Sequence, residues 1–440
     1  MIEVLKGAWA LLFGVMLLMV GNGMQGTLLG LRGEIEGFST YQMSVVMSGY
    51  FAGFLFGSRM APEMIRRVGH VRVFAALGSF VSAILILFPV FTDPVIWTLL
   101  RVALGFSFSG VYITAESWLN HAASNETRGQ ALSAYLVVQM VGIIAAQGLI
   151  LVDDPGGFVL FILPSVLVSL AFAPILLTVS PTPAFEATRR MSLRELFRIS
   201  PLGVVGVLIM GGVFSAEFGM AAVFGTEQGL TTREISLFIS AIYVGGLVLQ
   251  FPIGWLSDRL DRRTLIIAVA LVGAVTTTLP LLVPDAFPAL LLTAFFLGGT
   301  ANPLYALLIA YTNDFLEVED MPSASSGLMF VNGIGAVSGP LATGWFMGVL
   351  GPLGYFAFIA LVFAALVGYG LWRATRRPAP SVEETHSYAP VLQSASPVVL
   401  DMAQEIYAEA AEEAEEAEGG ASQAPEGGAT GTHPPDRAQF

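Results

Sequence analysis

Few ionisable side chains lie inside the long apolar stretches of the sequence, and three of them are candidates for chemistry: Glu217, Glu116 and Arg101. A charge at the centre of a bilayer costs about 2.5–3.5 kcal/mol on insertion scales, so such a group normally faces a partner or a wet cavity. Desolvation disfavours the carboxylate anion, and proton coupling requires a group that gains and loses a proton. We therefore predict Glu217 as the leading proton-coupling residue and Glu116 as a second. The alternatives are a protonated Glu217 held in the helix packing and a structural gate contact for Glu116.

One face of the apolar stretch 94–118 is polar. At 100° per residue, its polar side chains fall within an arc of about 80° of a helix: Arg101, Ser109, Tyr112 and Glu116. Arg101 and Glu116 would lie about 22 Å apart along that helix, so each needs a partner elsewhere. The face suits the lining of a cavity, in which Arg101 could hold an anionic group of a solute or a carboxylate on another helix.

Amides and phenols form a further set in the apolar stretches. We predict that they line a substrate cavity together with Arg101 and Tyr112: Asn22, Gln25, Gln139, Asn302, Tyr305 and Asn332. Such groups commonly orient a ligand in a mostly apolar pocket. The alternative is that each amide joins neighbouring helices by hydrogen bonds, which is also common in membranes.

The composition indicates the kind of element that positions these groups. The chain has 440 residues, of which 55% are hydrophobic and 12% are charged, with a mean hydropathy of +0.73. A soluble domain carries about 25% charged residues, so an ordinary soluble globule is excluded. What remains is a protein that crosses the bilayer several times. Because the chain has no cysteine, disulfides and thiolate chemistry are excluded as well.

Twelve stretches are long and apolar enough to cross a bilayer, which takes about 20 residues at 1.5 Å each. They lie near 8–29, 42–62, 71–91, 94–118, 129–151, 157–178, 202–225, 234–256, 264–283, 288–312, 323–348 and 352–373. We predict an all-α integral membrane protein of two pseudo-symmetric six-helix halves, 1–180 and 201–374, joined by a cytoplasmic linker over 181–200.

The basic residues predict the orientation, because cytoplasmic loops carry an excess of Lys and Arg. With the N-terminus in the cytoplasm, sixteen bases fall on that side, and only Arg32 and Arg233 fall outside. An even number of spans returns the C-terminus to the cytoplasm. Residues 375–440 then form a cytoplasmic tail, in which twelve carboxylates face three arginines. We predict that this tail is acidic and largely disordered, with a conditional helix over Asp401–Glu418; a docking site for a basic partner is the alternative.

Two loops in equivalent places of the halves are similar. The loop after the eighth span has the pattern Gly-x-x-x-Asp-Arg-x-x-Arg-Arg from Gly254 to Arg263, and the loop after the second contains Arg66-Arg67. Aligning Asp258 with Arg66 gives an offset of 192 residues, about half of the membrane portion. Duplicated halves are typical of secondary transporters, whose binding site lies between the repeats.

Over about 1–374 the chain resembles the major facilitator superfamily. The loop pattern is similar to that family's loop motif, and the run Glu116-Ser-Trp-Leu-Asn120 resembles its poorly characterised bacterial YcaD-like branch. The resemblance implies transport by alternating access and a multi-pass location in the bacterial inner membrane. It departs from the family in the first-half loop, where Arg66 occupies the position at which the motif has an acid.

The resemblance also implies a cytoplasmic gate, a loop that holds one conformation and releases it in another. The residues that match its motif are Gly254, Asp258, Arg259, Arg262 and Arg263. Asp258 would stabilise the start of the next helix, and the arginines would bridge to carboxylates or helix C-termini. The alternative is that Asp258 is only a helix cap and the arginines only mark the topology.

The sequence lacks the residues that catalysis with metals, nucleotides or nucleic acids would need. The four histidines are not spaced as metal ligands, no phosphate-binding loop is present, and no basic patch suits nucleic acid. We therefore expect no catalytic site, metal or cofactor. The sequence predicts a secondary transporter that moves a small solute through the bilayer, coupled to protons. The rival is a membrane-embedded sensor or assembly factor on a carrier-like scaffold, signalling through the acidic tail.

Overall fold

The computed structural model describes residues 2–123, 125–177, 191–317, 320–376, 388, 390–394, 396, 398–400 and 402–403. Within these ranges the chain is helical and contains no strand. The helices of the first half are α1 (Ile2–Ile35), α2 (Thr40–Val68), α3 (His70–Leu87), α4 (Pro94–Ala122), α5 (Asn125–Leu149), the short η1 (Ile150–Val152) and α6 (Val159–Leu177). Those that follow are α7 (Leu193–Ile199), α8 (Pro201–Ser215), η2 (Ala216–Met220), α9 (Ala221–Glu227), α10 (Thr232–Ser257), α11 (Arg262–Leu282), α12 (Phe287–Asn313), α13 (Met321–Leu350) and α14 (Gly354–Ala374).

Ten helical segments in the described part are long and apolar enough to cross a membrane, with α8, η2 and α9 counted as one. The sequence predicts twelve. The other two predicted spans correspond to α2, which is long enough but carries several charged residues, and to α6, whose counted apolar stretch Val159–Ala173 is shorter. The described part of the protein is therefore that of an all-helical membrane protein, in which ten segments are long and apolar enough to cross the bilayer.

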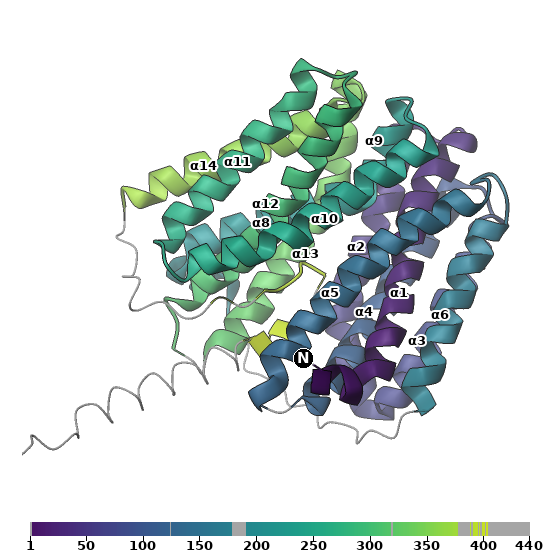
Figure 1. Ribbon diagram of the computed structural model, residues 1–440, viewed down its shortest axis with the longest axis horizontal. Coiled ribbons are helices and arrows are strands. Elements are labelled where there is room, and N and C mark those ends of the chain that lie inside the picture. The colour runs from purple at the N-terminus through teal and green to yellow at the C-terminus, as the bar shows by residue number, and fades with distance from the viewer. Residues whose placement is uncertain are drawn as a thin grey trace, which may run out of the picture.

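The helices form two groups that pack in the same way (Figure 1). In the first group α1 packs on α5, α2 on α4, and α3 on α6; in the second α8 packs on α13, α10 on α12, and α11 on α14. The groups meet mainly where α2 contacts α13 and α5 contacts α10. The interface between the two groups therefore lies along the middle of the molecule.

Glycine allows the closest crossings, and it does so at matching places in both halves. A Cβ atom at Gly105 of α4 would overlap the backbone carbonyl of Tyr50 in α2. In the second half, a Cβ atom at Gly245 of α10 would overlap the carbonyl of Phe295 in α12. Small residues let membrane helices approach closely and gain van der Waals contact, since water supplies no hydrophobic driving force there.

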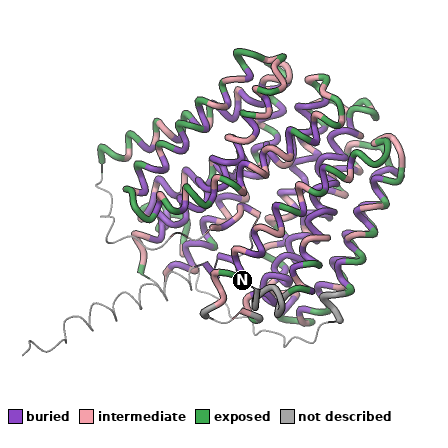
Figure 2. Tube along the Cα trace, viewed as in Figure 1, coloured by how far each residue is buried: buried purple, intermediate pink, exposed green. Residues whose placement is uncertain are grey.

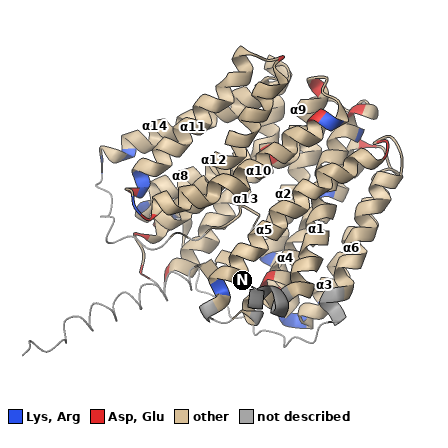
Figure 3. Cartoon of the chain, viewed as in Figure 1, with Lys and Arg blue, Asp and Glu red and all other residues tan. Residues whose placement is uncertain are grey.

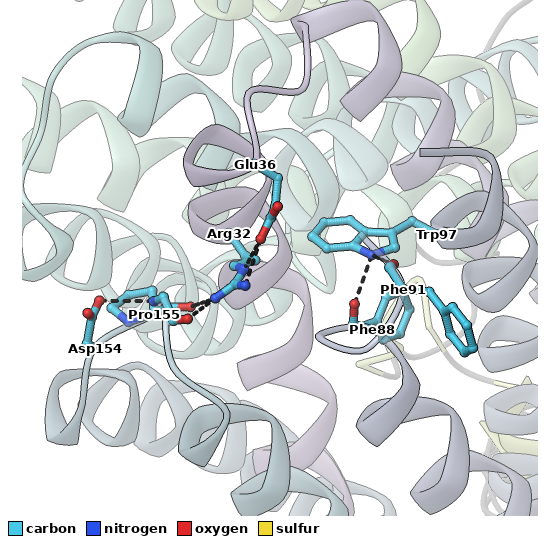
Figure 4. Close-up of polar contacts among 8 residues, drawn as sticks. Arg32, Glu36, Phe88, Phe91, Trp97, Asp154 and Pro155 are labelled. Carbon is cyan, nitrogen blue, oxygen red and sulfur yellow. Dashed lines mark hydrogen bonds and ion pairs between the residues drawn. The ribbon is translucent and has the colours of Figure 1, made fainter. Parts of the chain in front are cut away.

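We call the end of the bundle with the α2–α3 and α10–α11 connections the motif end, and the opposite end the far end. Polar contacts tie the loops at the far end (Figure 4). Arg32 forms an ion pair with Glu36 at 2.7 Å and donates to the carbonyl of Pro155 at 3.5 Å. The indole N–H of Trp97 donates to the carbonyl of Phe91 at 2.7 Å.

Buried residues concentrate along the inner faces of the helices (Figure 2), whereas charged side chains mostly lie near the helix ends (Figure 3). Among the described residues, five Asp, Glu, Lys or Arg residues are buried as a whole, in addition to the buried side chain of Asp314: Arg101, Glu116, Glu217, Arg262 and Arg263. All five were singled out from the sequence. Since burying a charge is costly, each of them needs a physical explanation.

Part of the tail, which the sequence predicts to be largely disordered over 375–440, is described by the structure. Val391, Val399, Leu400 and Met402 are buried, and a stretch of tail lies between the two halves at the motif end (Figure 1). The abundance of Pro, Ser and Ala concealed these short apolar runs. Most of the helix predicted over 401–418 lies outside the described residues, as does the linker before residue 191, after which α7 follows.

Candidate substrate-binding site

A central cavity lies between the two halves and takes its lining from both. Aromatic rings dominate it: Tyr50, Phe51, Phe54 and Tyr112 from the first half, and Phe214, Phe218 and Tyr243 from the second. Its polar members include Asn22, Asn302 and Asn332. Among the described residues, the lining contains no Asp, Glu, Lys or Arg. An aromatic cavity with a few amides matches the usual composition of small-molecule sites.

A chain of hydrogen bonds runs from Arg101 to the cavity. The Arg101 guanidinium donates to Oε1 of Gln25, whose amide N–H donates to Oδ1 of Asn22 at 3.2 Å. Asn22 then donates to the Tyr112 hydroxyl at 2.8 Å, and its Oδ1 accepts from the Tyr50 hydroxyl at 3.4 Å. Asn22, Tyr50 and Tyr112 reach the cavity, whereas Arg101 and Gln25 are not in its lining. Arg101 therefore orients the polar residues of the lining through Gln25, without lining the cavity itself.

The partners of Arg101 differ from the anionic ones that the sequence suggested. Its side chain is fully buried, lies 4.8 Å from the Tyr50 ring centroid and donates to the Met47 sulfur at 3.3 Å. Its Nε has no hydrogen-bond partner among the described residues. The positive charge is thus held by an amide, a ring face and a sulfur, in keeping with the affinity of guanidinium for aromatic faces.

Glu217 lies in η2, a single π-helical turn between α8 and α9. Such turns often occur at functional sites. The side chain is 5% exposed, and its Oε1 has no hydrogen-bond partner in the described part of the chain. Tyr243 and Tyr355 lie within electrostatic range of this carboxyl group. Tyr243 also lines the cavity, so one residue interacts with the carboxyl group and borders the space where a solute would sit.

Glu116 lies near the motif end of α4 and is fully buried. Its Oε1 accepts from the Tyr135 hydroxyl of α5 at 2.6 Å. Its Oε2 accepts from the backbone N–H of Ser396, a tail residue, at 3.1 Å. Both oxygens are therefore engaged in contacts at the motif end, unlike those of Glu217.

The remaining predicted cavity residues are distributed unevenly. Asn302 and Asn332 line the cavity from the second half. Gln139 and Tyr305 are buried but do not line it. The Tyr305 hydroxyl has no hydrogen-bond partner among the described residues. The polar residues in the apolar helices are thus buried, but only some of them line the cavity.

The loop-motif arginines Arg262 and Arg263 make buried contacts with the end of α12. The Nη1 atom of Arg262 donates to both carboxylate oxygens of Asp314, at 2.6 and 2.7 Å. Arg263 donates to the Tyr311 hydroxyl at 3.2 Å. These are the kind of bridges to a carboxylate near a helix C-terminus that the resemblance implied.

The loop-motif acid has a different place from the expected one. Asp258 directly follows α10, and its carboxylate accepts from the backbone N–H of Tyr388 in the tail at 2.9 Å. Asp261 is the residue that caps α11, by accepting from a backbone N–H of its first turn at 2.6 Å. Arg259 is exposed and stacks on Trp255, 4.1 Å from the ring centroid. The stabilised helix start therefore belongs to Asp261 and not to Asp258.

Apart from Tyr112, the aromatic lining was not predicted from the sequence. Tyr50 lies 5.6 Å from Phe218, and Phe51 lies 5.9 Å from Phe214, measured between ring centroids across the two halves. The sequence does not show whether an aromatic residue in an apolar helix faces lipid or a cavity. The one available signal was that Phe214 and Phe218 flank Glu217 in sequence.

Solved transporters have a similar fold. The nucleoside transporter NupG matches with a TM-score of 0.68 at 11% identity, over 84% of this chain and 98% of that one. A bacterial homologue of the human lysosomal transporter Spinster, solved in an inward-facing and unoccupied conformation, matches with a TM-score of 0.62 at 14% identity, over 92% and 98%. At these identities the likeness establishes the fold.

Two helical halves around a central cavity, with this likeness, define a fold class of helical membrane proteins. The family model of the Major Facilitator Superfamily matches residues 11–242 and 218–402, and the chain belongs to that family. Its relatives include the uncharacterized MFS-type transporter YcaD of Salmonella arizonae, 26% identical over 77% of this chain and 88% of that protein. An uncharacterized MFS-type transporter of Enterobacter sp. (strain 638) is 26% identical over 84% and 96%. The resemblance to the YcaD branch is confirmed.

Proposed function

We propose that this membrane transporter is a proton-coupled carrier that moves a small solute across the bacterial inner membrane by alternating access. In this proposal the chain crosses the membrane twelve times, both termini are cytoplasmic and the motif end faces the cytoplasm. The observation that carries it is the cavity between the halves, together with a buried carboxyl group behind its wall that has a free oxygen. Proton coupling needs a group of this kind, shielded from water and close to the solute.

The contacts at the far end support alternating access. There the Ser48 hydroxyl of α2 donates to the Val337 carbonyl of α13 at 2.6 Å, and the Thr40 hydroxyl donates to the Glu227 carboxylate. The halves are thus joined at the far end in this conformation. Rocking of one half against the other would have to break these contacts to open that end.

The lining predicts the chemistry of the solute. With rings on both sides and no charged side chain, the cavity suits a small uncharged solute with an apolar or aromatic body. Asn22, Asn302 and Asn332 would bind one or two of its polar groups. Nucleosides, named for the structural relative NupG, fit this description and belong among the first solutes to test.

The test is a proton-flux assay with purified protein in liposomes that contain a pH-sensitive dye. Nucleosides, sugars, amino acids, organic acids and lipophilic cations are added in separate pools. We expect one pool to change the internal pH, and Glu217→Gln to abolish that change and any uphill accumulation. Glu195→Gln, at an exposed carboxylate of α7, is the matched control and should behave as the unmodified protein. Full uphill transport by Glu217→Gln would contradict the assignment of the proton site.

A further inference from the structure

The C-terminal tail enters the cavity. We call the described residues from Tyr388 to Ala403 the tail segment. Leu392, Gln393 and Ser394 form part of the cavity lining, beside residues from both halves. The Asn332 amide donates to the Gln393 carbonyl at 3.4 Å, and the Gln393 amide donates to the Ala301 carbonyl of α12 at 3.5 Å. The tail segment therefore reaches side chains that the proposed function assigns to the solute.

Two carboxylates hold the tail segment, one from each half. Asp258 accepts from the backbone N–H of Tyr388, and Glu116 accepts from the backbone N–H of Ser396. Because the acceptors lie in α4 and at the end of α10, the tail segment bridges the two halves at the motif end.

The tail segment also fits its site in shape. Gly254, the first residue of the loop motif, lies against the Tyr388 ring, and a Cβ atom there would come within 2.6 Å of that ring. At the other end of the tail segment, Leu400 and Met402 are fully buried in the hydrophobic core. The tail segment thus has a site with two anchoring carboxylates, an aromatic contact and a buried apolar end.

From this arrangement we infer that the motif end of the cavity is a peptide-binding site whose ligand is the chain's own tail segment, which closes the cavity until it is released. The inference rests on the proposed carrier function, since it concerns access to the same cavity. It gives Glu116 and Asp258 a shared role: each holds the tail segment in the closed state. A solute entering or leaving at the motif end must displace Leu392 to Ser394 first.

Binding of the tail segment is tested by cross-linking, which the absence of native cysteine makes free of background. An ideal Cβ atom at position 254 lies 3.5 Å from Cγ of Tyr388, the place that a cysteine sulfur would take, close to what a disulfide needs. We expect the pair Gly254→Cys/Tyr388→Cys to oxidise to an intramolecular disulfide in the membrane. The pair Gly148→Cys/Tyr388→Cys should not, because Gly148 lies at the far end of α5.

Closure of the cavity by the tail segment is tested by labelling a cysteine in the cavity. Ser58 lines the cavity, so Ser58→Cys in nanodiscs reports its accessibility to a maleimide from either face. Ending the chain after Arg377 removes every contact of the tail segment and should raise the labelling rate by at least about tenfold, the change expected for losing one hydrogen bond alone. Ser396→Pro removes the N–H that Glu116 accepts and should act in the same direction. Ser396→Ala keeps that N–H and loses only the hydroxyl contacts of Ser396, so its effect should be smaller.

Neither readout needs a solute or proton flux, so both remain interpretable if the carrier assay fails. Absence of the Gly254–Tyr388 cross-link would overturn the peptide site. A cross-link combined with unchanged Ser58→Cys labelling in the shortened chain and in Ser396→Pro would overturn closure. Faster labelling in both, with the cross-link formed, supports the inference.

Discussion

The guanidinium of Arg262 binds both carboxylate oxygens of Asp314, at 2.6 and 2.7 Å, with both side chains almost completely buried. The same guanidinium donates from Nε to the Ser257 hydroxyl at 3.1 Å. Ser257 ends α10, Arg262 begins α11, and Asp314 follows α12. One side chain therefore joins three helix ends at the motif end, next to the loop that binds the tail segment.

We expect Arg262→Ala to destabilise the protein by about 3–5 kcal/mol, because it leaves the Asp314 carboxylate buried without its partner. Thermal unfolding in detergent, followed by the loss of monodisperse protein, measures the effect. Arg259→Ala is the control, since that arginine is exposed and stacks on a neighbouring ring. Adding Asp314→Asn to Arg262→Ala should restore part of the loss. Equal unfolding temperatures for the two arginine variants would contradict a structural role for the ion pair.

The close helix crossings give a second prediction. Gly105→Ala and Gly245→Ala each place a methyl group onto a backbone carbonyl, so each should cost about 1–3 kcal/mol of stability as an overpacked contact. Gly148→Ala is the matched control, because nothing lies within 4 Å of its added Cβ atom. Since alanine favours helix over glycine by up to about 1 kcal/mol, the control should be neutral or stabilising. Thermal unfolding separates the two outcomes, and a stable Gly105→Ala protein would argue against the tight α2–α4 crossing.

Arg101 is expected to act on solute binding through the residues it orients. Arg101→Lys keeps the charge but loses the planar group that lies by Tyr50 and bonds Gln25, so Asn22 should lose its fixed orientation. We expect the KM for the solute to rise on the order of tenfold with a smaller change in maximal rate, the cost of about one hydrogen bond. Initial-rate transport measures both parameters. Arg72→Lys, at an exposed position of α3, should leave them unchanged.

The sequence predicted the helical membrane architecture and the family because both depend on patterns that are continuous along the chain. Apolar runs of about 20 residues predict the membrane-spanning helices. The loop pattern around Asp258 indicates the family. The buried charges were also predictable, since a charge in an apolar run is visible by itself. All of Arg101, Glu116 and Glu217 lie inside the bundle.

What the sequence did not predict depends on which way side chains face. The aromatic lining escaped because Phe51 and Phe218 look like lipid-facing residues until the halves are assembled. The partner of Asp258 escaped because Tyr388 lies 130 residues further along the chain. The tail segment was assigned to disorder from its Pro and Ser content, although its scattered Val and Leu residues find an apolar site only in the folded bundle.

The orientation is the last prediction. Sixteen basic residues gather at the predicted cytoplasmic side and two at the other, so the motif end should face the cytoplasm. We expect a reporter that is active only in the cytoplasm to work when fused after Phe440 and to fail when inserted after Gly229, in the far-end turn between α9 and α10. A periplasmic reporter at the same two positions provides the reciprocal control. The opposite pattern would place the tail segment outside the cell, and closure of the cavity would then act on solute arriving from the periplasm.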